Sequence, residues 1–134
     1  MLKDGRVATR IPVQDLDRAR RFYADKLGLE ASEERPGGLL YRCASGDFAL
    51  FESAGASSGT FTQMGWEVDD IESTVAELKA RGVEFEEVDV PGLETRDGIA
   101  EVAGNYPSKG GKGERAAWFR DSEGNMLGIG QPIR

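Results

Sequence analysis

The stretch VQDLDRARRFYADKLGLE, residues 13–30, predicts the end of a strand, a capped helix and a turn in direct succession. Asp15 is a good N-cap, and apolar side chains then recur at helical spacing until Gly28 supplies a stop. Just upstream, RVATRIPV at residues 6–13 alternates in the way of a half-buried strand. The chain should therefore begin with a strand that leads directly into a helix.

Three short apolar runs follow this helix, and glycine-containing turn clusters separate them. They predict strands at residues 29–33, 39–43 and 48–53. The first half of the chain, about residues 5–53, is therefore expected to form a βαβββ module. The stretch AGASSG at residues 54–59 is small and flexible, as a linker should be.

The same pattern then restarts. Residues 68–85, VDDIESTVAELKARGVEF, repeat the opening stretch, with Asp69 or Asp70 as the helix cap and Gly82 at the place of Gly28. Further strands are predicted at residues 61–68, 83–88, 98–102, 115–120 and 126–130. We therefore expect one α+β domain over residues 1–134, with a second βαβββ module at about 60–131 and mixed sheets that close around a shared cleft.

A long segment rich in glycine and proline, residues 89–113, interrupts the second module. Loops longer than about 12–15 residues in a compact domain are usually lids, binding loops or locally disordered pieces. We expect the stretch YPSKGGKGE, residues 106–114, to be mobile, and the sequence does not determine the conformation of residues 103–113.

Composition excludes several function classes. Seventeen basic against 24 acidic residues give a net charge of −7, which repels nucleic acid and anionic membranes. No apolar run approaches the roughly 20 residues of a membrane span, and no secretion signal is recognisable. Cys43 is the only cysteine, which fits a reducing, cytoplasmic compartment, and its apolar setting predicts a buried structural thiol. The chain has no histidine, so a Ser-His or Cys-His catalytic pair is impossible.

Two motifs carry a resemblance to a known family. VQDLDRARRFYADKLGLE is similar to the first-module signature of the glyoxalase/bleomycin-resistance, or vicinal oxygen chelate, superfamily, and AAWFRDSEGNMLGIGQP at residues 116–132 resembles its closing hairpin. The resemblance implies two βαβββ modules around a cup-shaped cavity. Relatives include glyoxalase I, extradiol dioxygenases and antibiotic-sequestering proteins, so it fixes the fold better than the reaction.

The resemblance also implies where a metal would bind, and this chain departs from it there. The two first-strand positions hold Ala8 and Gln63, and the last-strand position holds Gly128. The fourth position falls at Phe51 or Glu52. One amide and at most one carboxylate do not make a divalent site, so we expect neither a metal nor another cofactor.

Strand parity indicates which residues should line the cavity. The predicted ligand-binding residues are Arg10, Phe48, Gln63, Glu67, Trp118 and Arg120. Trp118 is either an aromatic wall for a planar or cationic ligand or a plain core tryptophan, whereas Trp66 should pack beneath the second helix. Arg10 either binds the ligand or pairs with a carboxylate and fills the space left by a metal.

Two functions from different classes compete at this point. The leading hypothesis is a metal-independent protein that binds or sequesters a small organic molecule, in the manner of the antibiotic-resistance members. The alternative is a lyase, isomerase or transferase that uses Glu67, Glu52 or Tyr41 as a general acid or base. A third outcome is a cavity occluded by its own side chains. The resemblance further implies a homodimer.

Overall fold

The computed structural model describes residues 1–134. The chain forms two compact units, each of which is described by itself. The first unit comprises Met1–Ser58 with Asp121–Asn125, and the second comprises Gly59–Arg120 with Met126–Arg134. Each unit contains one α-helix and one four-stranded sheet. The predicted α+β class with two βαβββ modules is confirmed. Neither α-helix has the length and the apolar composition that a membrane span requires.

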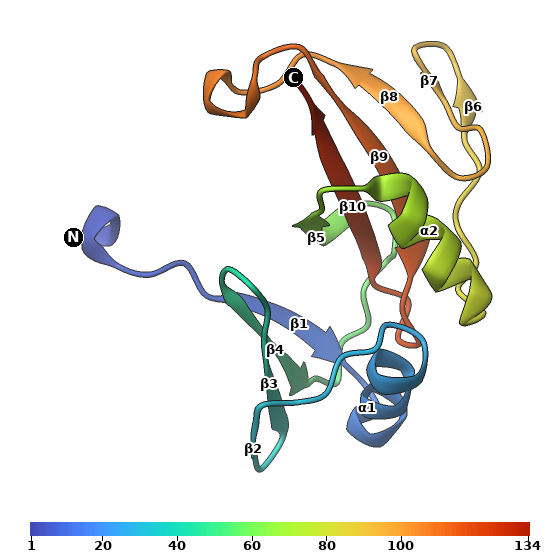
Figure 1. Cartoon of the computed structure of the whole chain (residues 1–134). Helices are drawn as coiled ribbons and strands as arrows, with labels where there is room; N and C mark the ends of the chain where they lie inside the picture. Colours follow the sequence, from blue (N-terminus) through green and yellow to red (C-terminus); the bar gives the residue numbers. More distant parts are fainter. The chain divides into compact units, whose positions relative to one another are not determined.

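The first unit follows the predicted element order (Figure 1). Its elements are η1 (Leu2–Asp4), β1 (Thr9–Val13), α1 (Leu16–Asp25), β2 (Glu33–Arg35), β3 (Gly38–Arg42) and β4 (Asp47–Glu52). The strand order is β1-β4-β3-β2, with β1 parallel to β4 and the other pairs antiparallel. The strand predicted at 29–33 begins only at Glu33, because the Leu29 N–H closes the end of the helix on the Tyr23 carbonyl.

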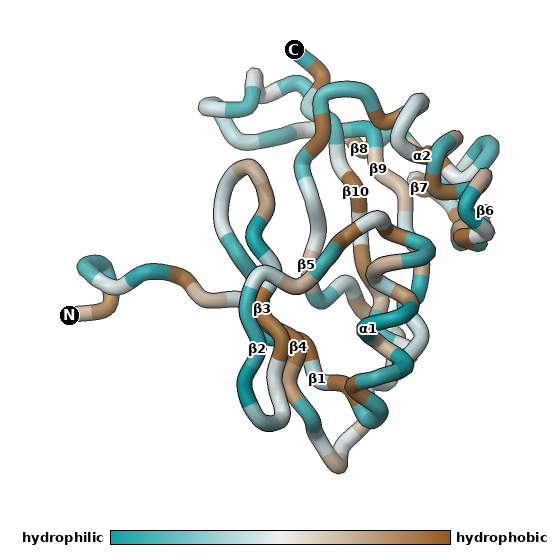
Figure 2. The backbone as a smooth tube through the Cα atoms, turned by 60° about the horizontal axis from the view of Figure 1, so that its bottom comes forward, coloured by the Kyte–Doolittle hydropathy of each residue, from teal (hydrophilic) through white to brown (hydrophobic).

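The core of the first unit lies between its sheet and α1. Ile11, Leu50 and Tyr41 are buried on the face that α1 covers, and Tyr23 of the helix is buried against them. The rings of Tyr41 and Phe48 stack with their centroids 5.0 Å apart. Figure 2 shows this hydrophobic concentration on β1, β3 and β4. Cys43 is half-buried in the turn after β3. The prediction of a buried thiol is therefore wrong.

The second unit repeats the plan with an added hairpin. Its elements are β5 (Thr62–Glu67), α2 (Ile71–Ala80), β6 (Asp89–Val90), β7 (Leu93–Glu94), β8 (Ala100–Ala103), η2 (Pro107–Lys109), β9 (Gly113–Arg120) and β10 (Met126–Ile133). The strand order is β5-β10-β9-β8, with β5 parallel to β10. The prediction of a strand at residues 83–88 is wrong. Because β8 pairs with the first half of β9, only Phe85 forms a bridge to the remaining edge, at Phe119.

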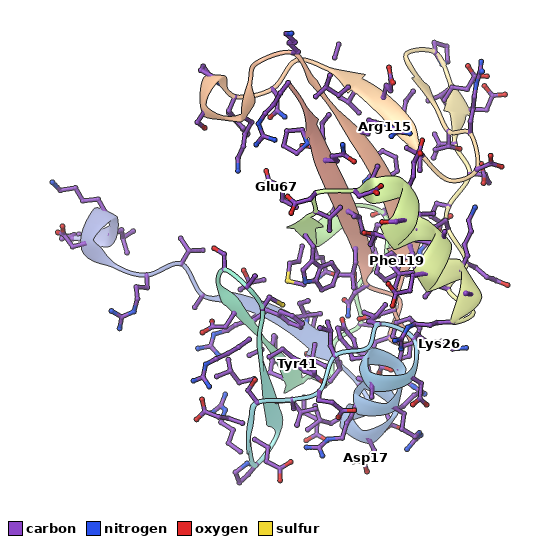
Figure 3. All side chains as sticks on the ribbon, in the orientation of Figure 1. Asp17, Lys26, Tyr41, Glu67, Arg115 and Phe119 are labelled. Carbon is purple, nitrogen blue, oxygen red and sulfur yellow. The ribbon has the colours of Figure 1, made fainter.

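Helix α2 covers one face of the second sheet. Phe119 is buried, and Figure 3 labels it beside α2. Its ring stacks on that of Trp66 with 6.4 Å between the centroids. On the same face, Arg115 forms an ion pair with Glu72 of the helix at 2.8 Å. Since side chains alternate along a strand, the neighbours of Phe119 and Arg115 project from the opposite face. That face carries the candidate site.

The turn between β9 and β10, Asp121–Asn125, belongs to the first unit and fixes the start of α1. The buried carboxylate of Glu123 accepts hydrogen bonds from the backbone N–H groups of Gln14 and Asp15, both at 3.0 Å. It also accepts two from the Arg18 guanidinium, at 2.8 and 2.9 Å. The hydrogen bond from Arg18 is the main reason that the pKa of Glu123 is lowered to about 2.

Two further contacts secure this turn. The Tyr23 hydroxyl donates to Asp121 Oδ2 at 2.7 Å, and the Asn125 side-chain amide donates to the Pro12 carbonyl at 2.9 Å. The caps predicted at the two helix starts are confirmed, because Asp15 accepts from the Arg18 N–H and Asp70 from the Ser73 N–H. The closing motif of the sequence therefore anchors the helix of the opening motif.

Candidate functional site

Three glycines form the floor of a hollow on the face of the second sheet that lies opposite α2. Gly65 of β5 pairs with Gly128 of β10, and Gly130 pairs with Glu67 two residues further along. Because these three residues have no side chains of their own, a space of about 460 Å³ remains beside them, lined among others by Gly65, Glu67, Glu114, Trp118, Gly128 and Gly130. We call it the glycine hollow. A β-carbon at Gly65 would lie 3.0 Å from the Gly128 carbonyl oxygen, so close strand pairing requires glycine there.

The indole of Trp118 forms one wall of the glycine hollow. A β-carbon at Gly128 would lie 3.5 Å from Trp118 Cδ1 and 3.6 Å from Nε1, so the ring covers this part of the floor. The side chain is half-buried, and its N–H makes no hydrogen bond within the protein. An indole held in this way offers an apolar face and a donor to a bound molecule.

The carboxylate of Glu114 covers the next floor position. A β-carbon at Gly130 would lie only 2.5 Å from Glu114 Oε1, so the carboxylate occupies the space that a side chain there would need. Glu114 is half-buried and has neither an ion-pair partner nor a side-chain hydrogen bond within the protein. The predicted strand began at Arg115, so Glu114 was missed. Its parity with Trp118, four residues along β9, is the signal that could have found it.

Glu67 lies at the same end of the hollow and is already paired. Lys109 of η2 places its Nζ 2.8 Å from Glu67 Oε1, and Figure 3 labels Glu67 beside β5. The segment expected to be mobile thus contains a short 3-10 helix with an ion pair to the hollow. No local pattern singled out Lys109, because its partner lies 42 residues earlier in the chain (109 − 67 = 42).

Two other predicted residues of the second unit have different surroundings. Gln63 sits at a β-bulge, because Thr62 pairs with Met126 while Met64 pairs with Leu127. Its amide oxygen is buried without a hydrogen-bond partner. Arg120 is held within the protein, where it forms an ion pair with Glu86 at 2.7 Å and donates to the Gly59 carbonyl at 2.9 Å.

In the first unit, Arg10 lies on the sheet face opposite α1. It borders a separate hollow of about 330 Å³ together with Ala8, Leu40 and Ala49. Its side chain is exposed and makes no ion pair, so the alternative in which it pairs with a carboxylate has no support in the structure.

The remaining predicted residues of this unit lie elsewhere. Phe48 and Tyr41 are buried on the opposite face, in the core, and Glu52 is exposed at the end of β4. Burial raises the pKa of Tyr41 to about 12, so its hydroxyl stays protonated at neutral pH.

The positions at which the resemblance places metal ligands do not fit a divalent ion. Ala8 and Gly128 offer no donor atom, and the Trp118 indole covers Gly128. Gln63 contributes one neutral amide, a weak ligand compared with histidine or a carboxylate. No three His, Cys, Asp or Glu side chains gather in the structure where they could hold a metal ion.

Comparison with known proteins identifies what the chain is similar to. The family model described as Glyoxalase/Bleomycin resistance protein/Dioxygenase superfamily matches residues 5–129. Among curated proteins, no sequence matches the chain.

Solved structures agree in fold. A glyoxalase/bleomycin resistance protein/dioxygenase from Alicyclobacillus acidocaldarius has a TM-score of 0.69 at 17% identity, covering 98% of this chain and 93% of that one. TnmS3, an antibiotic binding protein from Streptomyces sp. CB03234, has a TM-score of 0.61 at 23% identity over 94% and 93%. Lactoylglutathione lyase from Agrobacterium tumefaciens has a TM-score of 0.62 at 20% identity over 96% and 93%. At these identities the likeness concerns the fold alone.

Proposed function

Because the chain belongs to the Glyoxalase/Bleomycin resistance protein/Dioxygenase superfamily, we propose that it binds a small aromatic molecule in the glycine hollow and holds it unchanged. The observation that carries this proposal is the half-buried Trp118 indole beside a floor of three glycines. TnmS3, an antibiotic binding protein of the same fold, gives a precedent for a binding role.

The geometry of the hollow suits a flat ligand. The exposed Gly65 allows a ligand to approach the backbone of β5 closely, and the half-buried Trp118 indole supplies aromatic contact along one side. An offset or edge-on aromatic contact contributes about 0.5–1.5 kcal/mol beyond the apolar area that it buries. A planar molecule would thus gain both area and specific geometry from the same wall.

The competing proposal is a lyase, isomerase or transferase in which a carboxylate of the hollow acts as acid or base. Glu67 is the predicted catalytic candidate that lines the hollow, and its carboxylate is bound to Lys109. A general base must reach the proton that it removes, so this candidate would have to exchange Lys109 for substrate. Binding and catalysis therefore differ in the fate of the ligand.

A thermal-shift screen separates these possibilities. Glycopeptides, quinones, acyl-CoA esters and thiol adducts are tested against the wild type, Trp118→Ala and Phe61→Ala. Phe61 is an exposed aromatic residue outside the lining of the hollow, which makes it the matched control. We expect hits to raise the melting temperature of the wild type and of Phe61→Ala but not of Trp118→Ala.

Mass spectrometry of each hit after incubation then decides the class of function. An unchanged mass supports sequestration, and a converted mass supports the enzyme. Hits that stabilise Trp118→Ala as well as the wild type would contradict the proposed site.

A further inference from the structure

Two groups of the glycine hollow have unused capacity for polar interactions. The Trp118 indole lies over Gly128 and the Glu114 carboxylate over Gly130, and neither makes a polar contact within the protein. Gly128 and Gly130 are successive residues on one face of β10, and such residues are about 7 Å apart. An aromatic wall and a carboxylate therefore stand side by side, within reach of a single small molecule.

Both groups favour a positive charge on that molecule. A half-buried carboxylate without a partner has lost part of its hydration, and a cation that binds to it restores the lost stabilisation. The face of an indole is electron-rich and attracts an ammonium group placed over it. A ligand that is both aromatic and cationic would satisfy the two groups together.

The chain itself places an ammonium group at this end of the hollow. Gly130 has Glu114 above it and pairs with Glu67 on the neighbouring strand, and Lys109 Nζ lies 2.8 Å from Glu67 Oε1. Lys109 thus neutralises one of the two carboxylates, while Glu114 has no such counterpart. The lysine side chain is thus an example of a primary ammonium group bound by a carboxylate at this end of the hollow.

Two arginines of β9, Arg115 and Arg120, do not cancel this charge. Arg120 is bound to Glu86 and to the Gly59 carbonyl, and Arg115 projects from the α2 face, where it is paired with Glu72. The whole chain has a net charge of −7, so its field also attracts cations.

We infer that the ligand of the glycine hollow is an aromatic molecule with a protonated amine, its ring against Trp118 and its ammonium on Glu114. This inference rests on the proposed function and adds the chemical class of the ligand. Because Lys109 is ion-paired with Glu67, its ammonium group competes with the amine of the ligand for the carboxylates at this end of the hollow.

Three probes with one ring system test the inference at pH 7: 1-naphthylmethylamine, 1-naphthylmethanol and 1-naphthylacetate. They are cationic, neutral and anionic, respectively. Binding is followed by NMR of the two indole N–H signals, which the variants Trp118→Phe and Trp66→Phe assign. We expect the amine to shift the Trp118 signal and to bind about fivefold more tightly than the alcohol, with the acetate weakest.

Charge variants then assign this preference to named groups. In Glu114→Gln, the amine should lose most of its advantage over the alcohol, whose affinity should not change. Glu101→Gln is the matched control. Glu101 of β8 lies directly across the strands from Arg115, so it is on the sheet face opposite the glycine hollow. In Lys109→Met, Glu67 becomes available and the affinity for the amine should rise about threefold.

The outcomes separate this inference from the proposed function. Equal binding of all three probes, with the Trp118 signal shifted, would overturn the charge preference and leave aromatic binding in the hollow intact. An amine preference that is undiminished in Glu114→Gln would overturn the assignment to that carboxylate. If no probe moves the Trp118 signal, the inference fails, and the thermal-shift screen still judges the proposed function independently.

Discussion

The two helices begin after matching sequences, yet different groups bind the backbone at their starts. In the first unit, a carboxylate does so, because Glu123 accepts from two backbone N–H groups and from Arg18. In the second unit, the amide oxygen of Gln131 accepts from the Ile71 N–H at 2.8 Å. A helix N-terminus carries partial positive charge, which a carboxylate stabilises more than an amide does. One duplicated plan can therefore have an ionic anchor in one copy and a neutral anchor in the other.

The largest effect should come from removing the charge of the ionic anchor. Glu123→Gln keeps the shape of the side chain but leaves the Arg18 guanidinium without its counter-charge. A pKa lowered from 4.5 to about 2 corresponds to roughly 3 kcal/mol of stability at neutral pH. We expect a loss of that size in the free energy of unfolding, measured by urea denaturation.

A matched surface variant controls for the loss of one negative charge. Glu77 forms an exposed ion pair with Arg81 at 3.7 Å, and such pairs contribute about 0–1 kcal/mol. Glu77→Gln should therefore be close to the wild type. If Glu123→Gln were equally mild, the ionic anchor would not have the importance that we assign to it.

The difference between the anchors also has a pH signature. The pKa of Glu123 is lower in the folded state than its ordinary value of 4.5. Its contribution is therefore complete above that ordinary pKa and is lost as the pH falls from about 4.5 towards 2. Urea midpoints of the wild type should decrease over this range. Glu123→Gln should show a shallower decrease, and parallel curves for the two proteins would count against this explanation.

Changes at the neutral anchor should be smaller and can have either sign. Gln131→Leu removes the acceptor of the Ile71 N–H and should cost about 1 kcal/mol. Gln131→Glu makes the second anchor resemble the first, and Arg115, which is already paired with Glu72, lies directly across the strands as a shared counter-charge. It should add about 0.5 kcal/mol at neutral pH, measured by the same denaturation. A destabilised Gln131→Glu would mean that the two helix starts are not interchangeable in this respect.

Metals should have the smallest effect of all. The modules differ at their matched first-strand positions, Ala8 and Gln63, and neither residue is a strong ligand. We expect substoichiometric metal in protein purified without chelator, and no change in melting temperature with nickel, manganese or zinc. Tightly held metal that survives dialysis, or a large stabilisation by one ion, would contradict this expectation.

Local patterns were enough to predict the elements that depend on neighbouring residues. Helix α1, its cap Asp15 and the parity of β1 follow from spacing alone, and the structure has them as predicted. Strand parity also placed Trp118 and Glu67 on one face of the second sheet, where they line the same hollow. Short edge strands were predicted less well, because whether a segment forms such a strand depends on which other segment pairs with the same sheet edge.

Interactions between distant parts of the chain could not be predicted in this way. The Glu123 carboxylate is 105 residues from Arg18 and was expected only to be part of a turn. Lys109 and Glu67 meet because η2 folds back to β5, which no local pattern encodes. Glu114 was missed because the predicted strand began one residue too late. The sheet face that carries Trp118 and Glu67 was thus predictable from sequence, whereas Glu114 and the ion pair of Lys109 were not.

The place of the turn Asp121–Asn125 has a consequence for how the protein is made. A ribosome releases the chain from its N-terminus, so α1 leaves the exit tunnel long before Glu123 has been added. Until then, the backbone N–H groups of Gln14 and Asp15 lack their acceptor, and the core residue Tyr23 lacks Asp121. The first unit therefore completes its fold only after residues 121–125 have been made and have left the tunnel.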